Sequence, residues 1–134
     1  MSGAVVAHGS TLAQTFVEAV LGLFSRAVDP VQVEPREIRE VRAHGDSPEA
    51  LLAHWIAECY YVHELEGFVF HSIELARFDV ETRSGAEPMR LYAFLHGEAL
   101  DPIRHRVVSP VKPVALARIT IRSDREGYEI RLGP

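Results

Sequence analysis

The hydrophobic positions of the chain follow two different periods, and the change between them predicts the order of the elements. From residue 10 to residue 30, apolar residues recur every three or four positions, which places them on one face of a helix. Thr11 and Gln14 have the spacing of a capping box at its start, and Pro30 is expected to stop it. The apolar face consists of Leu12, Phe16, Ala19, Val20, Leu23, Phe24 and Ala27.

A second helix is predicted from residue 47 to residue 67. Ser47 is a favourable N-cap, Pro48 suits the first helical position because its missing N–H needs no partner there, and Gly67 suits the C-terminal end. We expect one face of this helix to be buried. That face consists of Leu51, Leu52, Trp55, Ile56, Cys59 and Tyr60.

Elsewhere apolar and polar residues alternate, which is the period of a β-strand. Two short extended pieces are predicted on either side of Pro35, which cannot donate a hydrogen bond to a neighbouring strand. A turn at residues 124–127 joins the last two strands. This order predicts an α+β fold, a single domain over residues 1–134 with two helices packed on one face of a mostly antiparallel sheet. The predicted strands lie at residues 4–7, 31–33, 41–43, 68–81, 89–98, 111–123 and 127–133.

Composition narrows the function classes. The chain has 14 basic and 19 acidic residues and a formal net charge of -5. A protein that coats a nucleic-acid duplex needs a basic face, so this balance argues against direct duplex binding. The single cysteine leaves no disulfide framework and no cysteine-based zinc site. The sequence shows no signal-peptide pattern and no apolar run of the roughly 18 residues that a membrane span needs, so we expect a cytoplasmic protein without a membrane partner.

Familiar catalytic patterns are not found in the sequence. There is no nucleophile elbow, P-loop or dinucleotide fingerprint. His63 begins a His-Glu pair but has no second histidine four residues later, so the zinc-protease pattern is missing. Cys59 lies on an apolar helix face and fits a small core residue better than a nucleophile. Independent hydrolysis at a histidine-lined cleft is therefore the weakest hypothesis, and we do not expect an enzyme.

The segment GEALDPIRHRVVSPVK, residues 97–112, carries an unusual density of charge for a connection between strands. An Asp-Pro pair favours a turn, because the aspartate side chain bonds backbone N–H groups two residues on while proline fixes the next φ angle. Gly97 permits a close approach of the backbone or a bulge at the end of the strand.

The Asp-Pro turn predicts an ordered loop from which Arg104, His105 and Arg106 project. Cationic donors held in this way suit docking onto a phosphate or a carboxylate. The alternative is a polar surface loop whose charges have no ligand.

Four segments, in this order, resemble the archease family: HGSTLAQTF, VEPRE, HGDSPEALLAHWIAECYYVHELEGFVF and GEALDPIRHRVVSPVKPV. They extend from about Val6 to Val114, and the last is the most specific. The resemblance implies a small α+β protein that assists the tRNA-splicing RNA ligase, the enzyme that joins exon halves through a guanylylated histidine. Archeases speed guanylylation and turnover of that ligase without being ligases. The expected partner is therefore a protein, with nucleic acid contacted only indirectly.

The resemblance also implies site residues, position by position. Lys112 matches the functional lysine of the family, and Asp46 matches the Gly-Asp pair ahead of the second helix. The family's signature loop is matched by Glu98, Asp101, Arg104 and His105. Archeases work with a divalent metal, calcium or magnesium.

The sequence departs from the family at the expected metal ligands. Neither the aspartate of the usual His-Thr-x-Asp segment nor the aspartate that usually closes the last strand is present, and Ala115 and Ala117 replace a threonine and a histidine after Lys112. Hard divalent cations need several oxygen ligands, so we expect no metal at the usual place, and the cofactor stays unknown. Either the chain is a divergent member or it is short at one end.

Two further expectations follow from the resemblance and the strand pattern. The alternative function is a metal-independent protein-binding or regulatory module on the same scaffold, with a different partner. The short first strand offers a sheet edge at which two copies of the chain could pair.

Overall fold

A computed structural model describes residues 4–81, 87–108 and 118–133, and this part of the chain folds into two α-helices, one short 3-10 helix and six strands. The helices are α1 (Leu12–Phe24), η1 (Pro30–Gln32) and α2 (Pro48–Glu66). The strands are β1 (Val5–Gly9), β2 (Glu37–Gly45), β3 (Phe68–Asp79), β4 (Met89–Ala99), β5 (Ile119–Asp124) and β6 (Gly127–Leu132).

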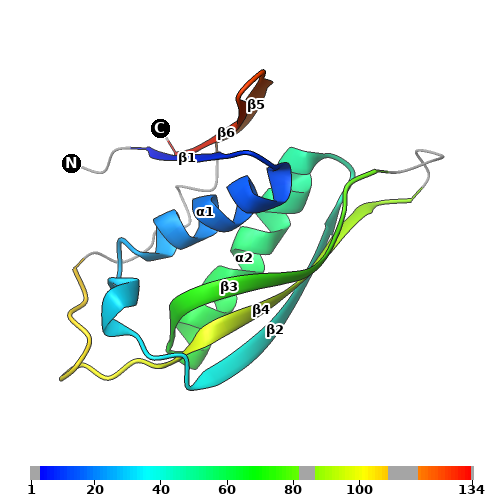
Figure 1. Cartoon of the computed structure of the whole chain (residues 1–134). Helices are drawn as coiled ribbons and strands as arrows, with labels where there is room; N and C mark the ends of the chain where they lie inside the picture. Colours follow the sequence, from blue (N-terminus) through cyan, green and yellow to red (C-terminus); the bar gives the residue numbers. More distant parts are fainter. Residues whose placement is uncertain (1–3, 82–86, 109–117, 134) are drawn as a thin grey trace.

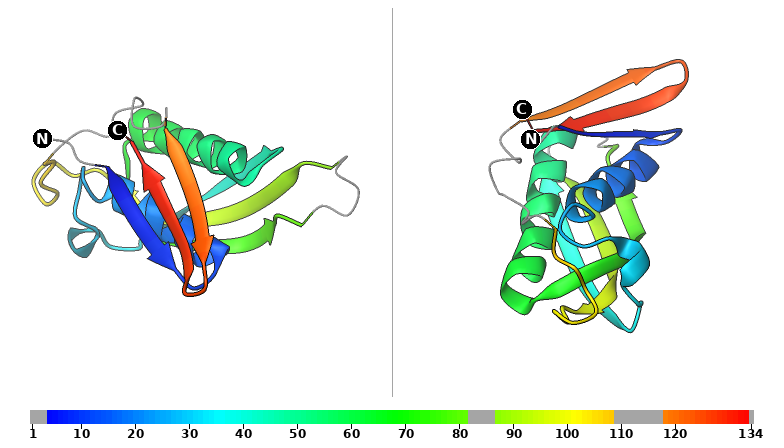
Figure 2. Two further views of the ribbon diagram at one scale, coloured as in Figure 1. Left: turned by 90° about the horizontal axis from the view of Figure 1, so that it is seen from above. Right: turned by 90° about the vertical axis from the view of Figure 1, so that its left-hand side faces the viewer.

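The six strands form two antiparallel sheets of three strands each, in the orders β1-β6-β5 and β2-β4-β3. Helix α1 packs against β1 and β6 on one side and against β3 on the other, while α2 packs mainly against β2 (Figure 1). The views of Figure 2 show the sheet of β1, β5 and β6 at the end of the molecule where both chain termini lie. The α+β class and the antiparallel pairing are confirmed, but the strands are divided between two sheets.

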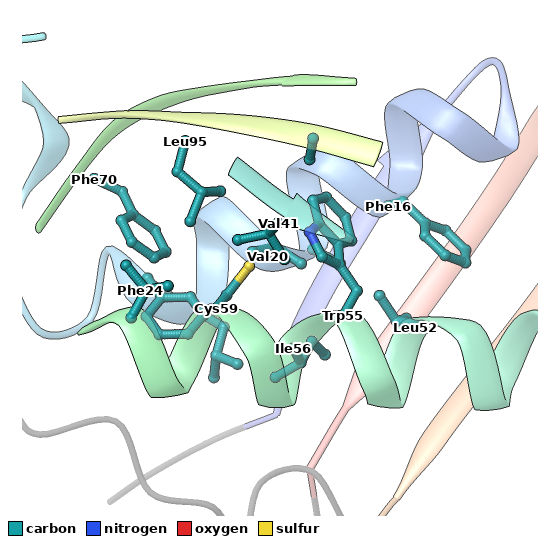
Figure 3. Packing of buried hydrophobic residues seen from close by; sticks show 14 of the residues in the cluster. Phe16, Val20, Phe24, Val41, Leu52, Trp55, Ile56, Cys59, Phe70 and Leu95 are labelled. Carbon is teal, nitrogen blue, oxygen red and sulfur yellow. The ribbon is translucent and has the colours of Figure 1, made fainter. Parts of the chain in front are cut away.

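The core lies where the predicted apolar faces of the two helices meet. Phe16 of α1 stacks on Trp55 of α2 with ring centroids 6.2 Å apart, and Phe24 lies against Phe70 of β3 (Figure 3). Cys59 is fully buried in the same cluster, and this burial raises the pKa of its thiol well above the ordinary value. The prediction that Cys59 is a core residue is confirmed.

The ends of the helices follow the predicted capping chemistry. The Thr11 hydroxyl accepts a hydrogen bond from the Gln14 N–H at 3.1 Å, and the Ser47 hydroxyl accepts one from the Ala50 N–H at 3.1 Å. The C-cap of α2 is Gly67, in the left-handed region at φ 62°.

The return bond of the predicted capping box takes a different partner. The Gln14 side chain accepts from the Ser10 N–H at 3.3 Å, one residue before the expected one.

Two local predictions are wrong, both around Pro30. Helix α1 ends at Phe24, and the residues expected to form a strand at 31–33 belong to η1 and its C-cap. The Asp29 carboxylate accepts a hydrogen bond from the Val31 N–H at 3.0 Å, and proline fixes the first φ angle of this turn. The Asp29 cap and Pro30 therefore favour the 3-10 turn over the strand that the alternating pattern predicted.

Strand β1 is an edge of its sheet, because β6 is the only described strand with which it pairs. An edge strand presents backbone groups to a further strand, so pairing of two copies of the chain keeps its physical basis. It stays a prediction.

Candidate functional site

Glu98, near the end of β4, binds segments that are far apart in the sequence. One carboxylate oxygen accepts hydrogen bonds from the Glu34 N–H at 2.8 Å and from His105 Nε2 at 2.9 Å. The other oxygen accepts from the Arg104 guanidinium, and Arg36 Nε lies 3.8 Å away. Glu98 is only 4% exposed. Two of the segments that carry the archease resemblance, VEPRE and GEALDPIRH, therefore meet at one buried carboxylate.

The surroundings of Glu98 keep it ionised. Burial alone would raise its pKa, but the hydrogen bonds from the Glu34 N–H, His105 and Arg104 outweigh burial and lower the pKa from 4.5 to about 2. A buried carboxylate is tolerable only when its oxygens are paired in this way.

His105 is 1% exposed, and its hydrogen bonds fix its tautomer. Its Nδ1 accepts from the Asp101 N–H at 2.8 Å, so the proton is on Nε2, which donates to Glu98. The expectation that His105 projects from the loop is therefore wrong. The imidazole turns inward because the buried Glu98 carboxylate needs a donor at that position.

The predicted Asp-Pro turn is confirmed. Asp101 Oδ1 accepts from the Ile103 N–H at 3.0 Å, and the Asp101 carbonyl accepts from the His105 N–H at 2.7 Å. The bond from Ile103 is the main reason why the pKa of Asp101 is lowered.

The guanidinium of Arg104 spans Glu98 and Asp101, and the bond to Glu98 is the largest cause of its raised pKa. Arg104 is thus bound within the loop and is not a cation held ready for a phosphate.

Gly97 is required at its position. A Cβ atom there would lie 1.9 Å from the Val69 carbonyl oxygen, a separation that no side chain can adopt without a backbone shift. This confirms the predicted close approach and places Glu98 tightly against β3.

The loop presents apolar side chains to solvent, which sequence reasoning did not single out. Ile103 is 95% exposed and Val108 73%, while Val31 of the adjacent η1 is 90% exposed. The loop lies against η1 in Figure 1. We call the exposed apolar set Val31, Ile103, Val107 and Val108 the loop surface.

Two hydrogen bonds hold the loop surface in place. Arg106 N–H donates to Gln32 Oε1 at 3.3 Å, and Val108 N–H donates to the Ala27 carbonyl at 2.9 Å. The only sequence signal for this surface was the apolar pair Val107-Val108 within a segment that otherwise reads as polar.

The other two residues implied by the resemblance are not part of this cluster. Asp46 is exposed between β2 and α2. It follows the end of β2 that pairs with Met89, whereas Glu37 at the other end pairs with Gly97. At about 3.3 Å per strand residue, Asp46 lies roughly 25–30 Å from Glu98. Lys112 lies outside the described residues.

The side chains around Glu98 do not offer suitable ligand atoms to a hard divalent cation. Within residues 4–81, 87–108 and 118–133, no group of three or more histidine, cysteine, aspartate or glutamate side chains is placed to hold a metal ion. Both Glu98 oxygens already accept from N–H groups, which a cation would have to displace. We therefore assign no metal-dependent step to this cluster.

Comparison with known proteins gives the family of the chain. The model of the archease protein family (MTH1598/TM1083) matches residues 3–132. The chain belongs to the archease family. Protein archease of Thermococcus gammatolerans is 37% identical over 120 residues, which is 90% of this chain and 81% of the relative. The archeases of Thermococcus kodakarensis and Pyrococcus abyssi are 34% and 30% identical over the same shares.

A solved structure supports the fold independently. The solution structure of Methanobacterium thermoautotrophicum protein 1598 is similar with a TM-score of 0.71 at 19% identity, covering 95% of this chain and 86% of that one. Membership of the archease family supports an accessory role of the archease type. None of the helices in the described ranges has the length and apolar character needed to cross a membrane.

Proposed function

We propose that this archease is an accessory factor of the tRNA-splicing RNA ligase, that it promotes guanylylation and turnover of the ligase, and that it does not itself join RNA. One observation carries the proposal beyond family membership. Ile103 and Val108 are 95% and 73% exposed. They lie on a loop that is held to the body of the protein by the bonds of Arg104 and His105 to Glu98. We also propose that the protein acts in the cytoplasm.

An ordered apolar loop suits docking to another protein. Its backbone is already held by the Asp101 turn and by the bonds of Arg106 and Val108 to the segment around η1. Little conformational entropy is then lost on binding, and the apolar side chains leave water at the interface. Lys112 follows Val108 by four residues in the sequence, and we propose that it acts on the ligase. A lysine supplied by one protein can stabilise charge in the active site of another.

The direct test measures the rate at which the purified ligase is guanylylated by GTP, with and without this archease. We expect the wild-type protein to raise the rate, and we expect the double variant Ile103→Asp, Val108→Asp to need about tenfold more protein for the same effect, because it places two charges in the interface. Lys112→Ala is expected to reduce the maximal acceleration.

Val6→Asp is the matched control, since Val6 is also exposed, at 42%, but lies on β1 away from the loop. Thermal unfolding of each variant shows that it is folded. The proposal fails if the wild-type protein leaves the guanylylation rate unchanged. It also fails if Val6→Asp weakens the effect as much as the loop variant does.

The bonded state of Glu98 favours a second candidate, a metal-independent protein-binding or regulatory module with a different partner. Thermal unfolding with added calcium or magnesium separates the two in part, because a metal bound only by the folded state raises the melting temperature. The second candidate predicts no shift with either metal and no binding of the purified ligase in a calorimetric titration. Binding of the ligase would rule it out.

A further inference from the structure

The sheet of β2, β3 and β4 has one face under the helices and one face that no described element covers. On the central strand β4, Leu91, Ala93 and Leu95 are buried against the core, and the side chains between them point to the opposite side. Figure 1 shows both helices on the same side of this sheet. We call the uncovered side the outer face; its β4 residues are Arg90, Tyr92, Phe94 and His96.

Three arginines surround Tyr92 on the outer face. In the strand register, Arg42 of β2 and Arg77 of β3 stand opposite Tyr92 on its two sides, and Arg90 precedes it by two residues on β4. The guanidinium carbon of Arg42 lies 4.4 Å from the centre of the Tyr92 ring. These residues and His44 line a cavity of about 330 Å³, and no described carboxylate lines it.

The cationic character of this cavity is only partly neutralised. Arg77 donates to Asp79, whereas Arg42 and Arg90 form no salt bridge with any acidic residue in the described ranges. Neighbouring guanidinium groups suit phosphate oxygens, which Arg binds in a planar, bidentate way.

Beside the arginines lies an aromatic platform. The rings of Tyr92 and Phe94 are 5.0 Å apart, and the Tyr92 hydroxyl donates to Glu40 at 2.6 Å, which fixes the orientation of the ring. Tyr92 and Phe94 are two residues apart on one face of the strand, so their Cα atoms are roughly 7 Å apart along β4. Single-stranded RNA is bound in this manner, with unstacked bases on aromatic rings or guanidinium planes and phosphates on arginines.

We propose that the outer face binds a short segment of single-stranded RNA, with phosphates on Arg42 and Arg90 and bases against the Tyr92–Phe94 pair. A duplex hides its bases, so the aromatic pair favours a single strand. The net charge of -5 does not oppose this, because a few local phosphate contacts do not need a basic protein. An acidic peptide would satisfy the arginines but would leave the aromatic pair without a role.

The proposal does not depend on the ligase. Tyr92 and the loop that follows Ala99 are at opposite ends of β4, roughly 23 Å apart at 3.3 Å per residue. Variants on the outer face can therefore fail in RNA binding while variants of the loop surface fail in ligase activation.

The test is fluorescence anisotropy of the whole protein with a labelled single-stranded RNA of about ten nucleotides, within the usual site size of such proteins. We expect saturable binding that weakens with salt. Arg42→Ala and Tyr92→Leu should each weaken it about tenfold, as expected for the loss of one stacked base or phosphate contact. Tyr92→Phe keeps the ring and should retain most of the affinity. Arg90→Ala should lower the salt slope by about 0.7.

Arg125→Ala, in the turn between β5 and β6, is the matched control for loss of one positive charge. It should leave the affinity unchanged. Four results would overturn the proposal: no binding of the RNA, equal loss with Arg125→Ala, equal affinity for a duplex of the same length, or tighter binding of polyglutamate than of RNA. A mononucleotide should compete with the labelled RNA only at a far higher concentration. That result would support an extended strand as the ligand and not a free nucleotide.

Discussion

Strand β4 carries two charged regions, one at each end, and they use their charges in opposite ways. At the C-terminal end, Glu98 is buried and bonded to Arg104 and His105. At the N-terminal end, Arg42 and Arg90 lie exposed beside an open cavity. The charges of the conspicuous sequence motif are thus bonded to one another around Glu98, whereas Arg42 and Arg90 form no salt bridge with an acidic residue in the described ranges.

The strongest test of this contrast is the removal of the Glu98 carboxylate. Glu98→Ala leaves Arg104 and His105 without their buried acceptor, and breaking such a pair costs about 3–5 kcal/mol. We expect a loss of about 4 kcal/mol in the free energy of unfolding, measured by urea denaturation. Glu74→Ala is the control, because Glu74 is exposed and His96 is its only salt-bridge partner in the described ranges. It should cost less than about 1 kcal/mol. Equal losses would remove the distinction between the two regions.

The dependence of the free energy of unfolding on pH, at acidic pH, provides a second test. The pKa of Glu98 is lower in the folded protein, about 2, than its ordinary value of 4.5. Its stabilisation is therefore present above pH 4.5 and is lost as the pH falls from 4.5 towards 2. The difference between these values corresponds to about 3 kcal/mol.

Unfolding of the wild type and of Glu98→Gln should be compared from pH 7 to pH 2. The two curves should converge as the pH falls through this window. Parallel curves would show that Glu98 titrates normally.

Local sequence signals predicted most of the elements, because their causes are local. Ser47, Pro48 and Gly67 mark the ends of α2 through caps that need no distant partner. The Asp101 turn is equally local, since its main bond spans two residues. The division into two sheets was not predicted. Strand period says which face is buried but not which strand pairs with which, and β1 pairs with β6 at the other end of the chain.

The site was harder to predict than the fold for the same reason. In the sequence, His105 lies in a charged segment and is therefore expected at the surface. Its burial follows from its bond to Glu98, which is itself buried. The outer-face cluster was invisible in the sequence, because Arg42, Arg77 and Arg90 come from three strands and meet only through the register.

The loop itself allows a smaller and more specific perturbation. Asp101→Ala removes the acceptor for the Ile103 N–H and should cost about 1 kcal/mol, measured by urea denaturation. Asp124→Ala is the matched change, because Asp124 accepts from the Glu126 and Gly127 N–H groups in the turn between β5 and β6.

Both aspartate variants should lose similar stability, but only Asp101→Ala should weaken ligase activation, since only this turn supports the loop surface. Ligase activation reduced equally by both would mean that the effect reflects stability alone.

The smallest effects on stability are expected on the outer face. Arg42 stacks on Tyr92 in an exposed position, where a cation–π contact contributes about 0.5–1 kcal/mol, and Arg90 forms no salt bridge with a described acidic residue. Arg90→Ala should change the free energy of unfolding by less than about 0.5 kcal/mol, and Arg42→Ala by no more than about 1 kcal/mol. A residue with a packing role shows the reverse pattern: its substitution lowers the free energy of unfolding strongly, and RNA affinity falls only because less protein is folded. If either substitution costs as much as Glu98→Ala, the arginines have a structural role and the two ends of β4 are alike. A small cost together with a tenfold loss of RNA affinity would show that their charge is available to a ligand because the fold does not use it.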